Sequence, residues 1–189
     1  MKQHFSIYFL LFFLFSLLTI TTAGAQDTTA TSDELLIQAK AAAKEKTGYP
    51  KAIELLKKAL VKSPDYADIR IYLGRLYTWT DKVDSARFQF NQVLAKEPKN
   101  SDAIAANFDV EYWNDNYPRA LDHANMGLLY YPDSSEFVIK KAKALSAMQD
   151  SRQALAYLKD RVQKNPGQTD VSKYYNDLKA EKTKNDPGH

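Results

Sequence analysis

Residues 67–100 read ADIRIYLGRLYTWTDKVDSARFQFNQVLAKEPKN. Apolar side chains recur at helical spacing in both halves of this stretch, at Ile69, Leu73, Leu76 and Tyr77 and then at Val83, Ala86, Phe90, Val93 and Leu94. Such spacing is typical of helices that bury one face. We therefore predict two consecutive helices that form a helical hairpin.

The same unit recurs along the chain with a period of 34 residues. Two columns carry the period: Pro64, Pro98, Pro132 and Pro166, and Ala52, Ala86, Ala120 and Ala154. Alanine lets two helices approach closely, and proline, which lacks an N–H, ends the second helix. A fixed period of this size indicates stacked repeats. We predict four helical hairpins, at residues 33–66, 67–100, 101–134 and 135–168.

The segments around the repeats have their own patterns. Residues 169–182 hold Val171, Tyr174, Tyr175 and Leu178 at helical spacing, which predicts a single capping helix. Polar residues 183–189 are expected to be disordered, and residues 26–32 (QDTTATS) to be a flexible linker.

The first 25 residues have the features of a secretory signal peptide. Lys2 precedes an apolar run from Phe5 to Ile20, and Ala23-Gly24-Ala25 supplies a small-x-small cleavage site. An uncleaved anchor is the alternative, but such a run spans only about 24 Å, less than the ~30 Å of a bilayer core. We expect cleavage, no transmembrane segment afterwards, and a periplasmic protein, with outer-membrane association left open.

Composition argues against several functions. The net charge of +3 is spread evenly, so nucleic acid is not an expected partner. Cysteine is absent, which excludes disulfides, thiolate metal sites and cysteine nucleophiles. His123 is the one histidine away from both ends of the chain, and no nucleophile lies at a compelling spacing from it. We expect a packed or surface imidazole, no enzymatic activity and no cofactor.

The repeat columns resemble the tetratricopeptide repeat. The second unit matches best, with a leucine, a small residue and an aromatic at Leu73, Gly74 and Tyr77, followed by Ala86 and Phe90. The third unit departs most, with Asn107, Phe108 and Glu111 at the positions expected for leucine, a small residue and an aromatic. The resemblance implies an all-α, right-handed solenoid of four helix-turn-helix repeats plus a C-terminal capping helix.

A narrower similarity involves tryptophan and aspartate 34 residues apart, at Trp79 with Asp81 and at Trp113 with Asp115. It resembles the periplasmic repeat region of YaiO-like outer-membrane proteins, which place such repeats before a β-barrel and are linked to exopolysaccharide export. Too few residues follow residue 168 for a barrel. We expect either a stand-alone adaptor or a truncated form of a longer protein.

In tetratricopeptide proteins the first helix of each repeat lines a concave groove, so the resemblance implies a partner-binding surface here. Its candidate residues are Ile71, Tyr72, Arg75, Thr78, Ala105, Asp109, Tyr112, Ile139 and Lys143. The Lys and Asn pair with which chaperone-binding members hold a terminal carboxylate is absent. An extended peptide of neutral or mixed charge, or a partner's helix, fits better.

Trp79 and Trp113 are also candidates for glycan stacking, with the nearby carboxylates as acceptors of hydroxyl protons. The favoured structural alternative is that each tryptophan wedges between hairpins and each aspartate caps the next helix. Asp109, Glu111 and Asp115 do not converge, because 109 and 111 point about 200° apart on a helix. We interpret them as a solvated acidic face and expect no metal site.

These observations favour a non-catalytic periplasmic scaffold that binds a protein segment, within an envelope or exopolysaccharide-export assembly. The alternative is a carbohydrate-binding module that uses the two tryptophans.

Overall fold

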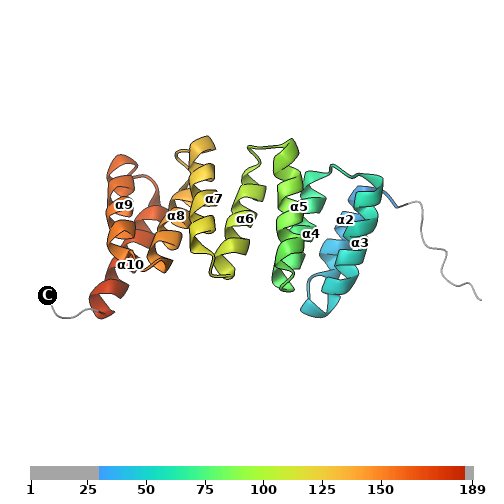
Figure 1. Cartoon of the computed structure of the whole chain (residues 1–189), viewed down its shortest axis with the longest axis horizontal. Coiled ribbons are helices and arrows are strands. Elements are labelled where there is room, and N and C mark those ends of the chain that lie inside the picture. The colour runs from blue at the N-terminus through green and yellow to red at the C-terminus, as the bar shows by residue number, and fades with distance from the viewer. Residues whose placement is uncertain (1–29, 186–189) are drawn as a thin grey trace, which may run out of the picture. The chain divides into compact units, whose positions relative to one another are not determined.

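Residues 30–185 are described by a computed structural model of the chain, and within them the structure is entirely helical (Figure 1). The α-helices are α2 (Ser32–Ala42), α3 (Tyr49–Lys62), α4 (Ala67–Trp79), α5 (Val83–Lys96), α6 (Ser101–Trp113), α7 (Tyr117–Tyr130), α8 (Ser135–Ala147), α9 (Ser151–Lys164) and α10 (Thr169–Asn185). The expected signal peptide and linker residues 26–29 lie outside the described residues.

The helices pair within each predicted unit, α2 with α3, α4 with α5, α6 with α7 and α8 with α9, and each pair packs on the next. Ala52, Ala86, Ala120 and Ala154 are each fully buried. Burial without a bulky side chain permits the close approach within each hairpin. The predicted fold of four helical hairpins and a capping helix is confirmed.

The proline column lies between the hairpins. α3 ends at Lys62 and α5 at Lys96, so Pro64 and Pro98 each stand two residues beyond the end of a second helix. Both rings are exposed. They therefore stop the helices without taking part in the core.

The turns inside the hairpins show that one expectation was wrong. Asp81 and Asp115, with Gln149 in the next repeat, have positive φ angles of 55°, 57° and 64°. Neither aspartate caps the following helix: α5 and α7 have no side-chain cap hydrogen bond. Asp115 instead accepts a hydrogen bond from the Tyr117 hydroxyl at 2.5 Å. Aspartate tolerates the left-handed conformation that this turn requires, which accounts for its recurrence.

Both ends of the repeat region are more ordered than expected. Thr31 is the N-cap of α2 and forms a capping box with Glu34, so the helix begins at Ser32, inside the expected linker. α10 runs to Asn185 rather than ending at 182. Its last turn contains lysines, which are favourable at a helix C-terminus, and the next proline comes only at Pro187.

Candidate functional site

A pocket of about 260 Å³ lies between the first helices of the second and third repeats. We call it the Trp pocket and define it by its lining residues Arg75, Thr78, Trp79, Phe90, Ala106, Asp109 and Trp113. α4 supplies the first three, α5 supplies Phe90, and α6 supplies the rest. Residues from two repeats therefore meet in one site.

The aromatic side chains of the pocket differ in their exposure. Trp79 is 45% and Trp113 is 59% exposed, and the Trp79 ring also packs on Tyr49 of the preceding hairpin, with 5.8 Å between ring centres. Trp79 therefore contacts the neighbouring hairpin, as expected of a wedge, but neither tryptophan is buried. Phe90 is fully buried beneath them and packs on Gly74, where an added Cβ would lie 2.4 Å from Phe90 Cε1. The small residue at this point lets Phe90 fill the core, and the tryptophans keep surface available to a ligand.

The two charged residues of the Trp pocket have different surroundings. The Lys140 ammonium donates a hydrogen bond to Asp109 at 2.5 Å and also lies over the Phe108 ring. Within residues 30–185, no carboxylate lies at ion-pair distance from Arg75. The carboxylate is thus already neutralised, and the guanidinium is left to interact with solvent or a ligand.

The other predicted groove residues lie outside the Trp pocket. Ile71 and Ala105 are buried, as residues of a groove floor would be. Ile139 packs against the core cluster that includes residues of α10, and Lys143 lies over the Tyr174 ring of that helix at 6.0 Å. The capping helix therefore contacts this end of the predicted surface.

The two predicted groove tyrosines pack against neighbouring side chains. The Lys40 ammonium lies 5.9 Å from the centre of the Tyr72 ring, and burial raises the pKa of the Tyr72 hydroxyl. Tyr112 stacks on Phe108 and meets Tyr117 edge-on, each with 5.5 Å between ring centres. Among the predicted residues, the structure brings together Arg75, Thr78, Trp79, Asp109 and Trp113.

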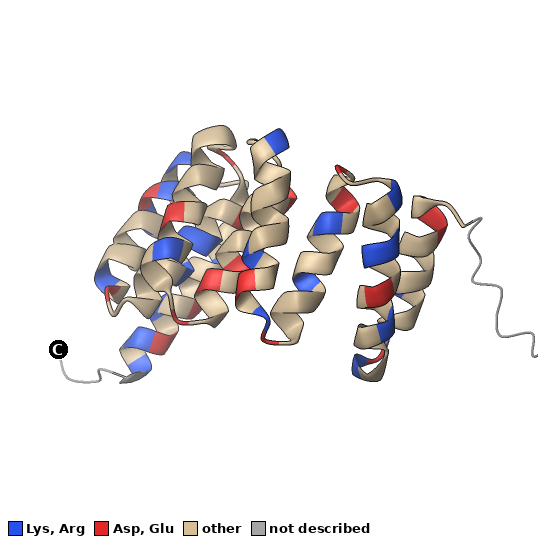
Figure 2. Cartoon of the chain, turned by 45° about the vertical axis from the view of Figure 1, so that its right-hand side comes forward, with Lys and Arg blue, Asp and Glu red and all other residues tan. Residues whose placement is uncertain are grey.

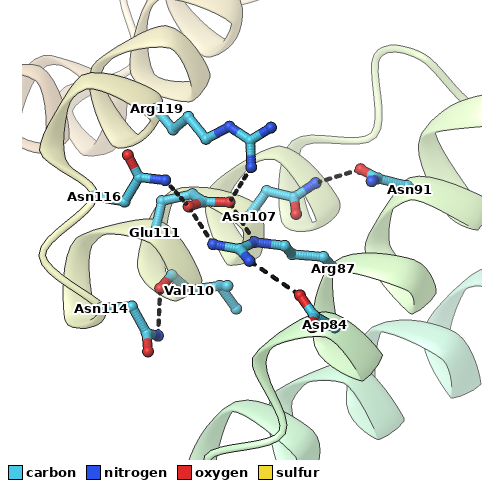
Figure 3. Close-up of polar contacts among 9 residues, drawn as sticks. All are labelled: Asp84, Arg87, Asn91, Asn107, Val110, Glu111, Asn114, Asn116 and Arg119. Atoms are coloured by element: carbon cyan, nitrogen blue, oxygen red, sulfur yellow. Dashed lines mark hydrogen bonds and ion pairs between the residues drawn. The ribbon is translucent and has the colours of Figure 1, made fainter.

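A polar cluster joins the second and third repeats (Figure 3). The Arg87 guanidinium donates two hydrogen bonds to Glu111, from Nε to Oε1 and from Nη2 to Oε2, both at 2.7 Å. Asn116 donates a third to Oε2 at 2.8 Å. Only 2% of the Glu111 side chain is exposed, so the expectation of a solvated acidic face was wrong for this residue.

This cluster explains two of the third repeat's departures from the family pattern. Glu111 replaces an aromatic core residue with a carboxylate that pairs with the preceding repeat. Asn107 donates a hydrogen bond to Asn91 of α5 at 3.3 Å. Burial disfavours the ionised form of Glu111, but the hydrogen bonds and charge of Arg87 outweigh it and lower the pKa of the carboxyl.

His123 lies on α7, near the polar cluster. Burial lowers the pKa of its imidazole, an effect that the charge of Glu111 only partly opposes. The side chain is therefore neutral at pH 7 and packed, as expected for a structural residue.

The charged surface is mixed. Figure 2 shows Lys and Arg interspersed with Asp and Glu along the helices. In the described part of the chain, no three or more His, Cys, Asp or Glu residues are grouped so as to hold a metal ion. None of the helices between residues 30 and 185 combines the length and the hydrophobicity needed to span a membrane.

Comparison with known proteins identifies the repeat. Residues 48–107 match the family model described as tetratricopeptide repeat. This segment of the chain is therefore similar to tetratricopeptide repeats. The matched residues include α4 and α5, and α6 as far as Asn107, and thus part of the Trp pocket.

Solved structures share the tetratricopeptide fold at low sequence identity. A crystal structure of MamA has a TM-score of 0.63 and 19% identity, covering 73% of this chain and 75% of MamA. Another MamA structure has a TM-score of 0.60 and 23% identity, covering 72% and 80%. A tetratricopeptide repeat protein from Parabacteroides merdae has a TM-score of 0.66 and 15% identity, covering 78% of this chain and 57% of its own. A search of curated proteins found no match.

Proposed function

We propose that the protein is a non-catalytic scaffold whose first helices bind a segment of a partner protein, with the Trp pocket as the anchor point. The observation that carries this proposal is the half-exposed pair Trp79 and Trp113, at a pocket formed between two repeats. Large aromatic residues around a pocket are typical of the energetic centre of a protein interface. The tetratricopeptide fold supports it, because such arrays use extended surfaces for binding.

The test is capture of partners by the exported protein and by Trp113→Ala. Phe88→Ala is a matched control, because Phe88 is an aromatic residue of similar exposure, 56%, outside the pocket. We expect a stoichiometric partner that the wild type and Phe88→Ala retain and that Trp113→Ala loses. Equal retention by all three would contradict the proposed anchor.

For the cellular location, we propose that residues 1–25 direct export to the periplasm and that the scaffold belongs to an envelope or exopolysaccharide-export assembly. The leader pattern supports export, and only the YaiO-like similarity supports the assembly. N-terminal sequencing of the mature protein should begin at Gln26. A protein that retains Phe5 to Ile20 after fractionation would overturn this part of the proposal.

A second candidate function is carbohydrate binding in the same pocket. Its support is the partial exposure of both tryptophans, because exposed aromatic surface can pack on sugar rings. A glycan array distinguishes the two functions. Binding of an oligosaccharide at micromolar affinity, lost in Trp113→Ala, would favour carbohydrate over a protein segment.

A further inference from the structure

One contact recurs between consecutive first helices. Counting positions from the start of each repeat, position 9 of the third and fourth repeats meets position 6 of the unit that follows, 31 residues later. At the first step, Lys40 at position 8 lies over Tyr72 instead. Asp109 at position 9 is paired with Lys140 at position 6, at 2.5 Å. Lys143 at position 9 lies over Tyr174 at the equivalent of position 6, at 6.0 Å. At both steps, a large residue at position 6 engages a charged one at position 9.

The step between α4 and α6 is different. The equivalent residues are Arg75 and Ala106, and both line the Trp pocket. The methyl group of Ala106 leaves the space in which the Lys140 and Tyr174 side chains lie at the following steps. The pocket therefore lies where a larger side chain at residue 106 would lie. Arg75 lacks the partner that such a side chain at position 6 would provide.

We propose that this space receives one bulky apolar side chain of an extended peptide, and that a neighbouring carboxylate of the peptide binds the Arg75 guanidinium. This inference rests on the proposed protein-binding function and names the ligand chemistry. The volume of about 260 Å³ suits a single large side chain, since pockets for small-molecule ligands usually measure about 300–1,000 Å³. The fully buried Phe90 and the two tryptophans give it apolar walls.

The charges favour an acidic partner. The Lys140 ammonium pairs with Asp109 and also lies 3.8 Å from Glu136. Arg75 has no carboxylate at ion-pair distance within the described residues, so the guanidinium is the lining cation available to a ligand. Guanidinium groups bind carboxylates through paired hydrogen bonds.

The engaged polar groups favour a peptide over a glycan. A sugar needs several free acceptors and donors for its hydroxyls. Asp109 is already paired with Lys140, and the Thr78 hydroxyl donates to the carbonyl oxygen of Gly74 at 3.0 Å. The Trp pocket then offers a ligand its apolar surface and the Arg75 guanidinium. These two features match an apolar side chain next to an acidic residue of a peptide.

The chain provides its own probe for a test. It contains two tryptophans, and both line the pocket, so its tryptophan fluorescence reports on this site. Heptapeptides selected from a random display library on the wild type would be titrated against four proteins: wild type, Ala106→Tyr, Arg75→Gln and Arg152→Gln. Arg152 is an exposed arginine on α9 and serves as the matched control. Oligogalacturonate would be titrated in parallel as an acidic glycan.

We expect enriched peptides to carry a bulky apolar residue within two positions of Asp or Glu and to change the tryptophan emission. Ala106→Tyr fills the pocket and Arg75→Gln removes the charge, so each should weaken binding about tenfold or more. Arg152→Gln should bind like the wild type. If Ala106→Tyr fails to fold by circular dichroism, Arg75→Gln decides the result.

Three outcomes would overturn the inference. Peptides that bind Ala106→Tyr and Arg75→Gln as tightly as the wild type would place the binding site outside the Trp pocket. This result would contradict the proposed anchor point and leave the protein-binding scaffold function standing. Enriched peptides without an acidic residue would show that Arg75 does not bind a carboxylate of the peptide. No enriched peptide would overturn both the inference and the proposed function, and a response to oligogalacturonate lost in Ala106→Tyr would then assign the pocket to a glycan.

Discussion

Removing Arg87 should destabilise the junction between the second and third repeats, because it leaves Glu111 buried and without its principal partner. The Glu111 side chain is 2% exposed and that of Arg87 is 26% exposed, with 2.7 Å between Nε and Oε1. Arg119 Nη1 remains 3.9 Å from Glu111, but its side chain is 63% exposed, which makes it a weak substitute.

The expected size follows from the cost of protonating Glu111. A buried carboxyl that takes up a proton costs about 1.4 kcal/mol for each pH unit above its ordinary pKa. From the ordinary value of 4.5 to pH 7, protonation of Glu111 therefore costs about 3.4 kcal/mol. Asn116 and Arg119 remain, so we expect Arg87→Met to lose about 2–3 kcal/mol of unfolding free energy at pH 7.

The pH dependence has a defined sign. In the wild type, the pKa of Glu111 is lowered, so the pair stabilises the fold above about pH 4.5, and this contribution disappears as the pH falls through the folded-state pKa. In Arg87→Met, protonation becomes cheaper on acidification. The loss relative to wild type should therefore shrink to about 1 kcal/mol at pH 5.

Urea unfolding at pH 7 and pH 5, followed by tryptophan emission, measures both effects. Trp79 on α4 and Trp113 on α6 belong to the two repeats that this junction joins. The double variant Arg87→Met with Glu111→Leu removes both charges, and we expect it within about 1 kcal/mol of wild type. The reasoning is refuted if Arg87→Met loses less than about 0.5 kcal/mol at pH 7, or if the double variant is as unstable as the single one.

Substitutions at three further positions test the packing of the array by thermal unfolding. Gly48→Ala would place a Cβ 1.8 Å from the carbonyl oxygen of Ala42, so we expect a loss of about 3 kcal/mol or failure to fold; a stability equal to wild type would contradict this contact. Ala120→Leu overfills a fully buried position in the third hairpin and should cost about 1–3 kcal/mol. Gln149→Val places a β-branched residue at a φ of 64° and should cost about 1–2 kcal/mol, whereas Gln149→Gly should not destabilise.

The fold could be predicted because its determinants repeat within one sequence. Ala52 and Ala86 recur with the period of the hairpin, and each is buried for the same reason in every unit. Local periodicity therefore specifies the helices and the order in which they stack. The ends of α2 and α10 were harder to predict, because they depend on capping and the absence of a helix breaker rather than on the repeat.

The site could be predicted only in part. The groove pattern identified Arg75, Thr78 and Asp109, but Ala106 and Phe90 were missed because a pocket depends on what lies across from a side chain in the next helix. One signal was present in the sequence. Ala106 is a small residue at a position where Tyr72 and Lys140 occur in the neighbouring units.

The burial of a charged side chain was the second feature that the sequence did not predict. Glu111 was interpreted as solvated because a carboxylate in a helical pattern is usually exposed. Its partner Arg87 lies 24 residues earlier, in another repeat, and periodicity does not show such a pair. The departure of Glu111 from the aromatic residue typical of the family was the available indication.

The size of the residue at position 6 has a consequence for how such arrays diversify. Ala106 leaves a hollow at one step, whereas Lys140 occupies the corresponding space at the next. A single exchange of a large for a small side chain on a first helix can thus shift the point of recognition by one repeat, while the alanine and proline columns stay intact. New specificities can arise in this architecture without any change in chain length or helix order.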